Sequence, residues 1–456
     1  MPISPARTAA FDVLLQVERE GAYASELLHS SRYAKLSPAD HGLATEIVMG
    51  VLRWRLTLDR KIACSSSQRL EKLDVEVLTA LRVATYQMTY LDRVPQRAAV
   101  HESVELVKRS RKGSAAPFVN AVLRKISNEM EWTGELCDAG AGLEGGPTIL
   151  EQPPTADNLA ATYSHPAWLV KRWVKHYGWE TARCICRHDQ AIASTALRLP
   201  GPGVETELEK AGVRLLGGEL LKTAARVESG DLTHTALYRE GRIAIQDEAS
   251  QLVALLVGNG DNILDCCAAP GGKTRIIAER NPEAKILAAE LYSRRARLLR
   301  KLVPVKNVEV ITADVLTLPA SRRFDRVLAD VPCSGTGTLA RNPEIKWRLQ
   351  PDDLADLHAR QFAILRAAMR HLVPGGRLVY STCSLEREEN ENVVENALAA
   401  DQSFRVIDCR QELERLRDEN ELAWQDLDSL TSGPYLRTIP GVHPSDGFFA
   451  SIVEKF

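Results

Sequence analysis

The stretch "LDCCAAPGGKT", residues 264–274, places an apolar run directly before a glycine-rich turn. Small residues and glycines let a backbone approach a ligand closely, and a helix that starts after them presents free N–H groups. A Walker phosphate loop needs a glycine five residues before Gly272, but Cys267 stands there. The G-x-G-x-x-G spacing of a dinucleotide site is also missing. The stretch therefore predicts a strand and a ligand loop that is not of the Walker type.

Apolar runs of this kind recur through the carboxyl-terminal part of the chain, with helical segments between them. Such strands, alternating with helices, predict a parallel sheet that is covered on both faces. Ligands bind at the carboxyl ends of parallel strands, so the residues after each run are the candidates for function. The runs are "NILDCCA" (262–268), "KILAAEL" (285–291), "VEVITAD" (308–314), "FDRVLADVP" (324–332) and "GRLVYSTCS" (376–384), and "DGFFASIVEKF" (446–456) adds a late strand.

Three carboxylates follow the second, third and fourth runs, namely Glu290, Asp314 and Asp330. Glu290 lies 19 residues after Gly271, close to the spacing at which an acidic residue meets a ribose diol. Carboxylates at strand ends without a phosphate clamp suit a nucleoside such as S-adenosylmethionine, whose ribose hydroxyls and adenine amine can donate to them. Taken singly, each carboxylate could instead be a helix cap or a turn former.

Two cysteines indicate the reaction. Cys333 lies in "DVPCSGTG" and Cys383 in "YSTCS", each just past a predicted strand. A lone buried cysteine is usually an inert small hydrophobe, but these two lie at adjacent ligand-facing strand ends. Cytosine C5 becomes nucleophilic once a thiolate adds to C6, and Asp330 could hydrogen-bond the base as charge develops. The pattern therefore favours methylation of cytosine C5, and the residues alone do not say which cysteine is the nucleophile.

Composition sets wider limits on the kind of protein. The chain has 456 residues with 58 Lys+Arg against 60 Asp+Glu, so any nucleic-acid binding must come from local patches. Nine cysteines are too few and too irregular for a secreted disulfide framework, and Cys184, Cys186 and His188 are more typical of an ordinary helix than of a metal site. The amino terminus does not resemble a signal peptide, and no run is apolar for long enough to span a bilayer. We expect a cytoplasmic protein without a metal.

The chain divides into four predicted parts. Residues 1–135 have helical periodicity, for instance at Ile47, Val51, Trp54 and Leu58, and predict an all-α bundle. Residues 136–158 are rich in Gly and Pro and predict a linker. Residues 159–245 predict a small α/β module, and residues 246–456 form the Rossmann-like α/β domain.

Several longer motifs resemble the RNA cytosine-C5 methyltransferases. They are "DCCAAPGGKT", "LADVPCSGTGTLARNPEIKWR", "VPGGRLVYSTCSLEREENENVV" and the terminal "DGFFASIVEKF". The front of the chain, including "VMGVLRWRLTLDRKI" and "FVNAVLRKI", is similar to the NusB-like helical domain of the ribosomal RNA small-subunit methyltransferase B group. The resemblance covers nearly the whole chain and implies a class I methyltransferase that acts on a cytosine of 16S ribosomal RNA.

The resemblance also implies a role for each motif residue. Cys383, in the "TC" motif, would be the nucleophile; Cys333, in the "PC" motif, would assist product release; and Asp330 would orient the base. The S-adenosylmethionine site would comprise Cys267, Ala268, Ala269, Pro270, Gly271, Gly272, Lys273, Glu290, Asp314 and Asp330. The family usually has Asp at the position of Glu290, and one more methylene should still reach the diol. DNA cytosine-C5 methyltransferases attack with the "PC" cysteine instead, so the choice of Cys383 is inherited from the RNA family.

The expected partner is ribosomal RNA whose target cytosine is unpaired or flipped out, and the expected oligomeric state is a monomer. Basic clusters that could meet RNA are Lys108, Arg109, Arg111 and Lys112, then Lys171, Arg172 and Lys175 beside Trp168 and Trp173, then Arg294, Arg295, Arg297, Arg300 and Lys301. Such clusters are often only solvated helix faces. Two alternatives stay open: the same chemistry on transfer RNA or another ribosomal site, and a non-catalytic RNA-binding or ribosome-assembly protein.

Overall fold

A computed structural model describes residues 3–132, 155–201 and 203–456. These residues form two compact units. Unit 1 comprises residues up to Ile192 together with Leu339–Arg348, and unit 2 comprises Ala193–Thr338 together with Leu349–Phe456. Most of the predicted 136–158 linker lies outside the described residues, and its described end begins at Thr155, whose side chain caps the next helix. The predicted domain boundaries stay a prediction.

Unit 1 is helical, as the periodicity predicts. Ser4 and Ser37 cap the first and third helices, each followed by a proline in the first turn. The stripe of Ile47, Val51, Trp54 and Leu58 is split between two helices, because the first ends at Arg53 and the next begins at Arg55. The helices are α1 (Pro5–Glu20), α2 (Ala24–Leu28), α3 (Pro38–Arg53), α4 (Arg55–Ser65), α5 (Val75–Tyr90), α6 (Gln96–Arg109), α7 (Ala116–Trp132), α8 (Ala156–Thr162), α9 (Ala167–Tyr177), α10 (Trp179–Gln190) and α16 (Ile345–Arg348).

The segment Leu339–Arg348, which contains "NPEIKW", packs within unit 1. Its Trp347 Nε1 donates to the Leu52 carbonyl at 2.6 Å, and the buried Lys346 Nζ donates to the carbonyls of Arg53 and Ser164, both at 3.1 Å. These acceptors lie where α3 ends and just after α8, so the segment satisfies carbonyls that those helix ends leave open. The motif therefore has a structural use in holding helices together.

Unit 2 is built on a sheet in the order β11-β12-β13-β9-β8-β5-β6-β7, with β10 paired to β13. β7, β6, β5, β8 and β9 are parallel, so their carboxyl ends share one edge. The strands are β5 (Asn262–Asp265), β6 (Lys285–Glu290), β7 (Val308–Thr312), β8 (Phe324–Asp330), β9 (Leu372–Thr382), β10 (Phe404–Ile407), β11 (Thr431–Ser432), β12 (Tyr435–Arg437) and β13 (Phe449–Lys455).

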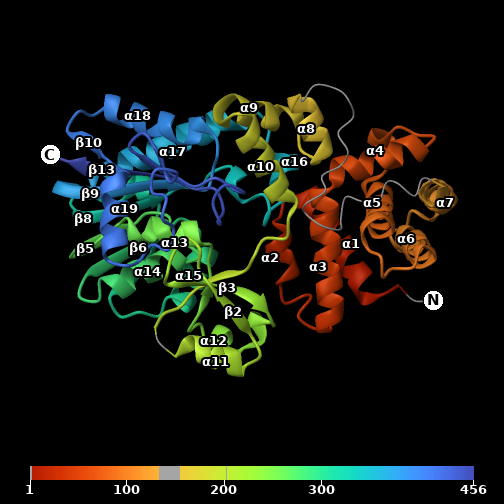
Figure 1. The fold of residues 1–456 in the computed structure, drawn as a ribbon, viewed down its shortest axis with the longest axis horizontal. Helices are drawn as coiled ribbons and strands as arrows, with labels where there is room; N and C mark the ends of the chain where they lie inside the picture. Colours follow the sequence, from red (N-terminus) through yellow and green to blue (C-terminus); the bar gives the residue numbers. More distant parts are fainter. Residues whose placement is uncertain (1–2, 133–154, 202) are drawn as a thin grey trace. The chain divides into compact units, whose positions relative to one another are not determined.

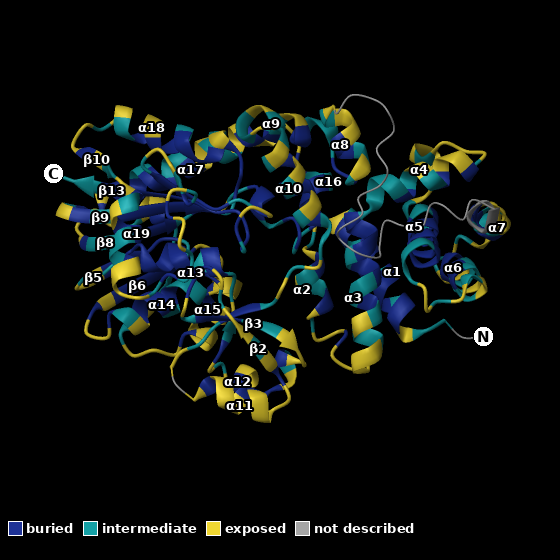
Figure 2. Ribbon diagram, viewed as in Figure 1, coloured by how far each residue is buried: buried dark blue, intermediate teal, exposed yellow. Residues whose placement is uncertain are grey.

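Helices cover both faces of this sheet (Figure 1). On one face Ile263 and Ile286 pack against α13 (Glu248–Leu255), α14 (Gly272–Arg280) and α19 (Cys409–Asp418). On the other face Leu264 and Leu287 pack against α17 (Asp353–Arg370) and α18 (Glu391–Ala399). Figure 2 shows the resulting band of buried residues along the strands. The predicted sheet covered on both faces is confirmed, with β7, β6, β5, β8 and β9 as its parallel part. The sheet as a whole is mixed, because β13, β12, β11 and β10 pair antiparallel, and the sequence reading did not foresee β10, β11 and β12.

A second sheet of four antiparallel strands, in the order β2-β3-β1-β4, precedes the large one. In the large sheet, α15 (Ser293–Leu302) packs on β6. The small sheet carries α11 (Val204–Lys210) and α12 (Ala236–Arg239). Its strands are β1 (Ala196–Arg198), β2 (Arg214–Gly217), β3 (Ala224–Ser229) and β4 (Ala244–Ile245). Among the described residues, no helix has the length and apolarity to cross a membrane.

The buried ammonium of Lys346 predicts how the stability of unit 1 depends on pH. Burial lowers the pKa of Lys346 to about 7, against 10.5 for an exposed lysine. Between these values the unfolded chain binds more protons than the folded one, so stability rises with pH. We expect unit 1 to gain up to about 3 kcal/mol between about pH 7 and pH 9.5, and Lys346→Met to lack this gain. The free energy of unfolding of unit 1 at each pH can be measured in urea, with hydrogen exchange of the amides of α3 and α9 as the probe.

Lys210→Met, on the exposed side of α11, is the control and should leave the pH profile unchanged. An identical rise with pH in wild type and Lys346→Met would show that another group titrates.

Candidate active site

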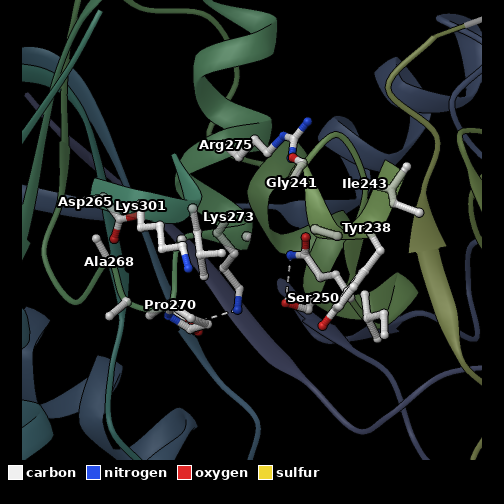
Figure 3. A pocket seen from close by; sticks show the side chains of 18 of the residues that line it. Tyr238, Gly241, Ile243, Ser250, Asp265, Ala268, Pro270, Lys273, Arg275 and Lys301 are labelled. Atoms are coloured by element: carbon white, nitrogen blue, oxygen red, sulfur yellow. Dashed lines mark hydrogen bonds and ion pairs between the residues drawn. The ribbon is translucent and has the colours of Figure 1, made fainter. Parts of the chain in front are cut away.

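A cavity of about 510 Å³ opens at the carboxyl edge of the large sheet in unit 2 (Figure 3). Asp265, Ala268 and Pro270 lie toward one end of it, and Tyr238, Ile243 and Ser250 lie toward the other. The cavity is therefore shared between the loop after β5 and the segment from α12 (Ala236–Arg239) through β4 to the start of α13. Every residue of the predicted loop from Cys267 to Lys273 lines it, and Asp330 does too.

The loop after β5 is held in place by the residues around its glycines. Gly271 has a φ of +118°, and a Cβ there would lie 2.6 Å from Val303 Cγ2 and 2.7 Å from Leu299 Cδ1. Any other residue here would push against Leu299, in α15, and against Val303, which directly follows α15, so this backbone requires glycine. Arg275, in the helix that follows, donates to the carbonyls of Gly241 and Arg242 and so ties α14 to the small sheet.

Asp265 is a buried carboxylate at the base of this loop, missed in the sequence reading because it lies inside the apolar run. Its Oδ2 accepts a 2.7 Å hydrogen bond from Thr274 Oγ1, and its Oδ1 has no hydrogen-bond partner among the described residues. Burial raises the pKa of Asp265 to about 7, and the nearby Asp330 carboxylate adds to the rise. The cavity thus has an acceptor oxygen that a ligand donor could satisfy.

Lys273 and Asp330 form an ion pair within the cavity, with Nζ 2.7 Å from Oδ2. The other oxygen, Oδ1, accepts a 2.8 Å hydrogen bond from Ser381 Oγ, on the neighbouring strand β9. Burial alone would lower the pKa of the Lys273 ammonium, but Asp330 and the nearby Cys383 outweigh it and raise the pKa. A fixed positive charge therefore stands beside the carboxylate that the sequence assigns to the base.

The two predicted cysteines are brought together, with Cys333 Sγ 3.2 Å from Cys383 Sγ. Both are partly exposed. The hydrogen bond with Cys383, followed by burial, raises the pKa of the Cys333 thiol well above its ordinary value. Cys333 therefore stays protonated near neutral pH, which suits a thiol that gives a proton to its neighbour.

Glu290 and Asp314 do not line the cavity, although both lie at the same edge of the sheet. Glu290 is only 3% exposed, and its Oε1 accepts from the Tyr292 backbone N–H at 3.0 Å. Asp314 accepts a 2.9 Å hydrogen bond from the Leu316 N–H and caps the short helix Val315–Thr317. Asp314 is therefore a helix cap in this structure, as a single carboxylate after a strand often is. A ligand-binding role for Glu290 or for Asp314 stays a prediction.

A buried polar cluster behind the two thiols was also missed by sequence reasoning. It consists of Ser334, Ser384, Gln361 and Glu389, linked by hydrogen bonds. The signal was present in "SLEREENEN", an acidic run directly after the "TC" cysteine, but acidic runs more often mark a solvated face.

Comparisons with known proteins show the family of the chain. The family model described as "NusB family" matches residues 4–128, and the one described as "16S rRNA methyltransferase RsmB/F" matches residues 252–454. A Bacillus subtilis protein named "Probable ribosomal RNA small subunit methyltransferase B" is 33% identical over 404 residues, which is 85% of this chain and 87% of that protein. The chain belongs to the RsmB family. Vibrio cholerae has a relative named "Ribosomal RNA small subunit methyltransferase B", 30% identical over 465 residues, which is 98% of this chain and 97% of that protein.

Solved structures agree on the fold. PH0851 has a TM-score of 0.79 at 23% identity and covers 100% of both chains, and NSun6 from Pyrococcus horikoshii, solved with SFG, has a TM-score of 0.53 at 20% identity, covering 64% of this chain and 98% of that one. The predicted resemblance and the predicted fold, a NusB-like helical domain followed by a Rossmann-like methyltransferase domain, are both confirmed.

The close contacts of Gly271 predict that an added methyl group destabilises unit 2. Gly271→Ala forces a side chain into a positive φ and against Val303 and Leu299. Gly258→Ala is the matched control, because Gly258 also has a positive φ of +71° but has no atom within 4 Å of an added Cβ. We expect Gly271→Ala to cost about 1–3 kcal/mol more than Gly258→Ala in urea unfolding. Equal losses of unfolding free energy in the two variants would mean that α15 moves aside for the added methyl group without a penalty.

Proposed function

We propose that this RsmB-family chain transfers a methyl group from S-adenosylmethionine to cytosine C5 of 16S ribosomal RNA, with Cys383 as the nucleophile. The observation that carries the proposal is the thiol pair at 3.2 Å, beside a Lys273–Asp330 ion pair at 2.7 Å. The ribosomal substrate rests on the names of the relatives in Bacillus subtilis and Vibrio cholerae and on the NusB-like domain.

The residues around the loop fit the methyl donor. Asp265 Oδ1 is an unpaired buried acceptor, and the glycines of the loop leave the backbone open to a ligand. The loop from Cys267 to Lys273 would hold the donor, with Glu290 at the ribose, Asp314 near the adenine and Asp330 shared with the base. S-adenosylmethionine, when bound, supplies the methyl group as an electrophile. The carboxylates of Asp265 and Asp330 would offset its sulfonium charge.

The reaction at the base follows from the thiols and the ion pair. The thiolate of Cys383 adds to cytosine C6, forming an S–C6 bond and making C5 nucleophilic. Asp330 orients the base by accepting a hydrogen bond from the exocyclic amine, and the Lys273 ammonium stabilises the negative charge that develops at N3 and on the ring. After methylation the C5 proton leaves to water and the S–C6 bond breaks. Cys333, kept protonated by its raised pKa, donates a proton to the departing sulfur.

The far end of the cavity suits the flanking RNA. Tyr238 is 36% exposed and offers a ring on which a base can stack. Arg239 also lines the cavity and makes no side-chain hydrogen bond or ion pair with the other described residues. Lys301, which is likewise free among the described residues, lies toward the loop end beside Asp265 (Figure 3). A free cation and an aromatic ring at the far end match a sugar–phosphate chain with unstacked bases better than they match a small apolar ligand.

Methyl transfer from labelled S-adenosylmethionine tests the substrate. We expect label in 16S RNA stripped of most ribosomal proteins, and bisulfite sequencing should place it at one cytosine. Label confined to transfer RNA would overturn the ribosomal assignment. RNA binding without any label would favour the non-catalytic alternative, in which the chain only assists ribosome assembly.

The two thiols predict opposite behaviour of two variants. Cys383→Ala should lower kcat by more than about 10³-fold and form no covalent complex, because it lacks the attacking sulfur. Cys333→Ala should accumulate a covalent enzyme–RNA complex that survives denaturing gels, because release is slowed. The roles are reversed if Cys383→Ala traps the complex and Cys333→Ala does not.

A further inference from the structure

The carboxylate of Glu389 lies at the centre of the polar cluster behind the two thiols. Glu389 is fully buried and ends the short helix Arg387–Glu389. Its Oε1 accepts from the Ser334 backbone N–H at 2.7 Å and from Gln361 Nε2 at 2.9 Å. Its Oε2 accepts from the hydroxyls of Ser334 and Ser384. Four hydrogen-bond donors of the protein thus converge on one carboxylate.

Two of these donors belong to the residues that directly follow the two cysteines. Ser334 follows Cys333, and Ser384 follows Cys383, so the carboxylate joins the two loops immediately beside their thiols. The serine hydroxyls also lie 3.0 Å from each other. Gln361, which donates to Glu389, donates to the Pro332 carbonyl at 3.0 Å as well and so holds the first loop from its other side.

We propose that Glu389 is a positioning residue that sets the separation of the Cys333 and Cys383 thiols. A buried carboxylate that accepts several hydrogen bonds is costly to disturb, because each lost partner leaves a desolvated polar group. The loops are therefore held at the distance at which one thiol can pass a proton to the other. The catalytic consequence rests on the proposed function, whereas the effect on thiol separation does not.

Replacement by glutamine tests the clamp with little change in volume. The amide has one acceptor oxygen and one NH₂ group, so it cannot accept from the Ser334 N–H and from both hydroxyls as the carboxylate does. Glu412→Gln is the matched control, because Glu412 is a buried carboxylate that pairs with Arg377 and Arg415, away from this cluster. Ser384→Ala removes a single arm of the clamp and serves if Glu389→Gln does not fold.

The thiol separation can be measured as the rate of disulfide formation with diamide. The two thiol hydrogens pass to its N=N bond, which is reduced to the hydrazine, while an S–S bond joins Cys333 and Cys383. Mass spectrometry of the linked peptides separates this disulfide from products of other cysteines, such as the exposed Cys64. We expect Glu389→Gln, or Ser384→Ala in its place, to form the disulfide at least about tenfold more slowly than wild type and Glu412→Gln. An unchanged rate in a folded variant overturns the proposal.

Methylation kinetics provide the second measurement. A positioning role predicts that Glu389→Gln lowers kcat by about 10²-fold, while KM for RNA and for S-adenosylmethionine changes less than about twofold. A large rise in either KM with an unchanged kcat would instead assign Glu389 to ligand binding. If wild type methylates no RNA, the proposed function fails, but the disulfide rates still decide the role of Glu389.

Discussion

The pairing of β8 with β9 is the constraint on which the candidate active site depends. The two strands are parallel, and their register places Asp330 opposite Ser381. Asp330 is therefore hydrogen-bonded by the strand that carries the second cysteine, and the loops after both strands must start side by side. A shift of one residue would turn Ser381 to the other face of the sheet and remove this bond. The 3.2 Å distance between the thiols therefore depends first on the register of β8 and β9, and then on the conformation of the two loops.

The buried carboxylates of the site differ in how far hydrogen bonds and ion pairs compensate their charge. Asp330 keeps both oxygens occupied, one by Lys273 and one by Ser381. Among the described residues, Thr274 is the one side-chain hydrogen-bond partner of Asp265, and burial raises the pKa of Asp265 to about 7. A ligand that brings a positive charge or a donor to Asp265 would favour its charged form, so binding of such a ligand should release a proton near neutral pH. The end of the cavity at the loop after β5 is thus better adapted to a cationic ligand than to a phosphate.

Much of this site could be predicted from the sequence, for a physical reason. Buried parallel strands are continuous apolar runs, so their ends can be read directly, and Cys267, Lys273, Asp330, Cys333 and Cys383 all lie at such ends. What could not be read depends on contacts between distant segments. The clamp of Glu389 needs the β8 and β9 loops to be neighbours, and the break at Trp54 has no proline or glycine to mark it. The 339–348 segment lies between two elements of the sheet domain, and only its contacts assign it to unit 1.

Hydrogen bonds on both sides of residue 339 hold the chain where it passes from unit 2 to unit 1. The 339–348 segment begins six residues after Cys333 and is held in unit 1 by the hydrogen bonds of Lys346 and Trp347. Just before it, the Gly337 N–H donates to the Cys383 carbonyl at 2.9 Å, so the chain leaves unit 2 from a residue bonded to the second cysteine loop. The first cysteine loop is therefore bonded to the second at Gly337, and again through the Glu389 carboxylate, which accepts from Ser334 and from Ser384.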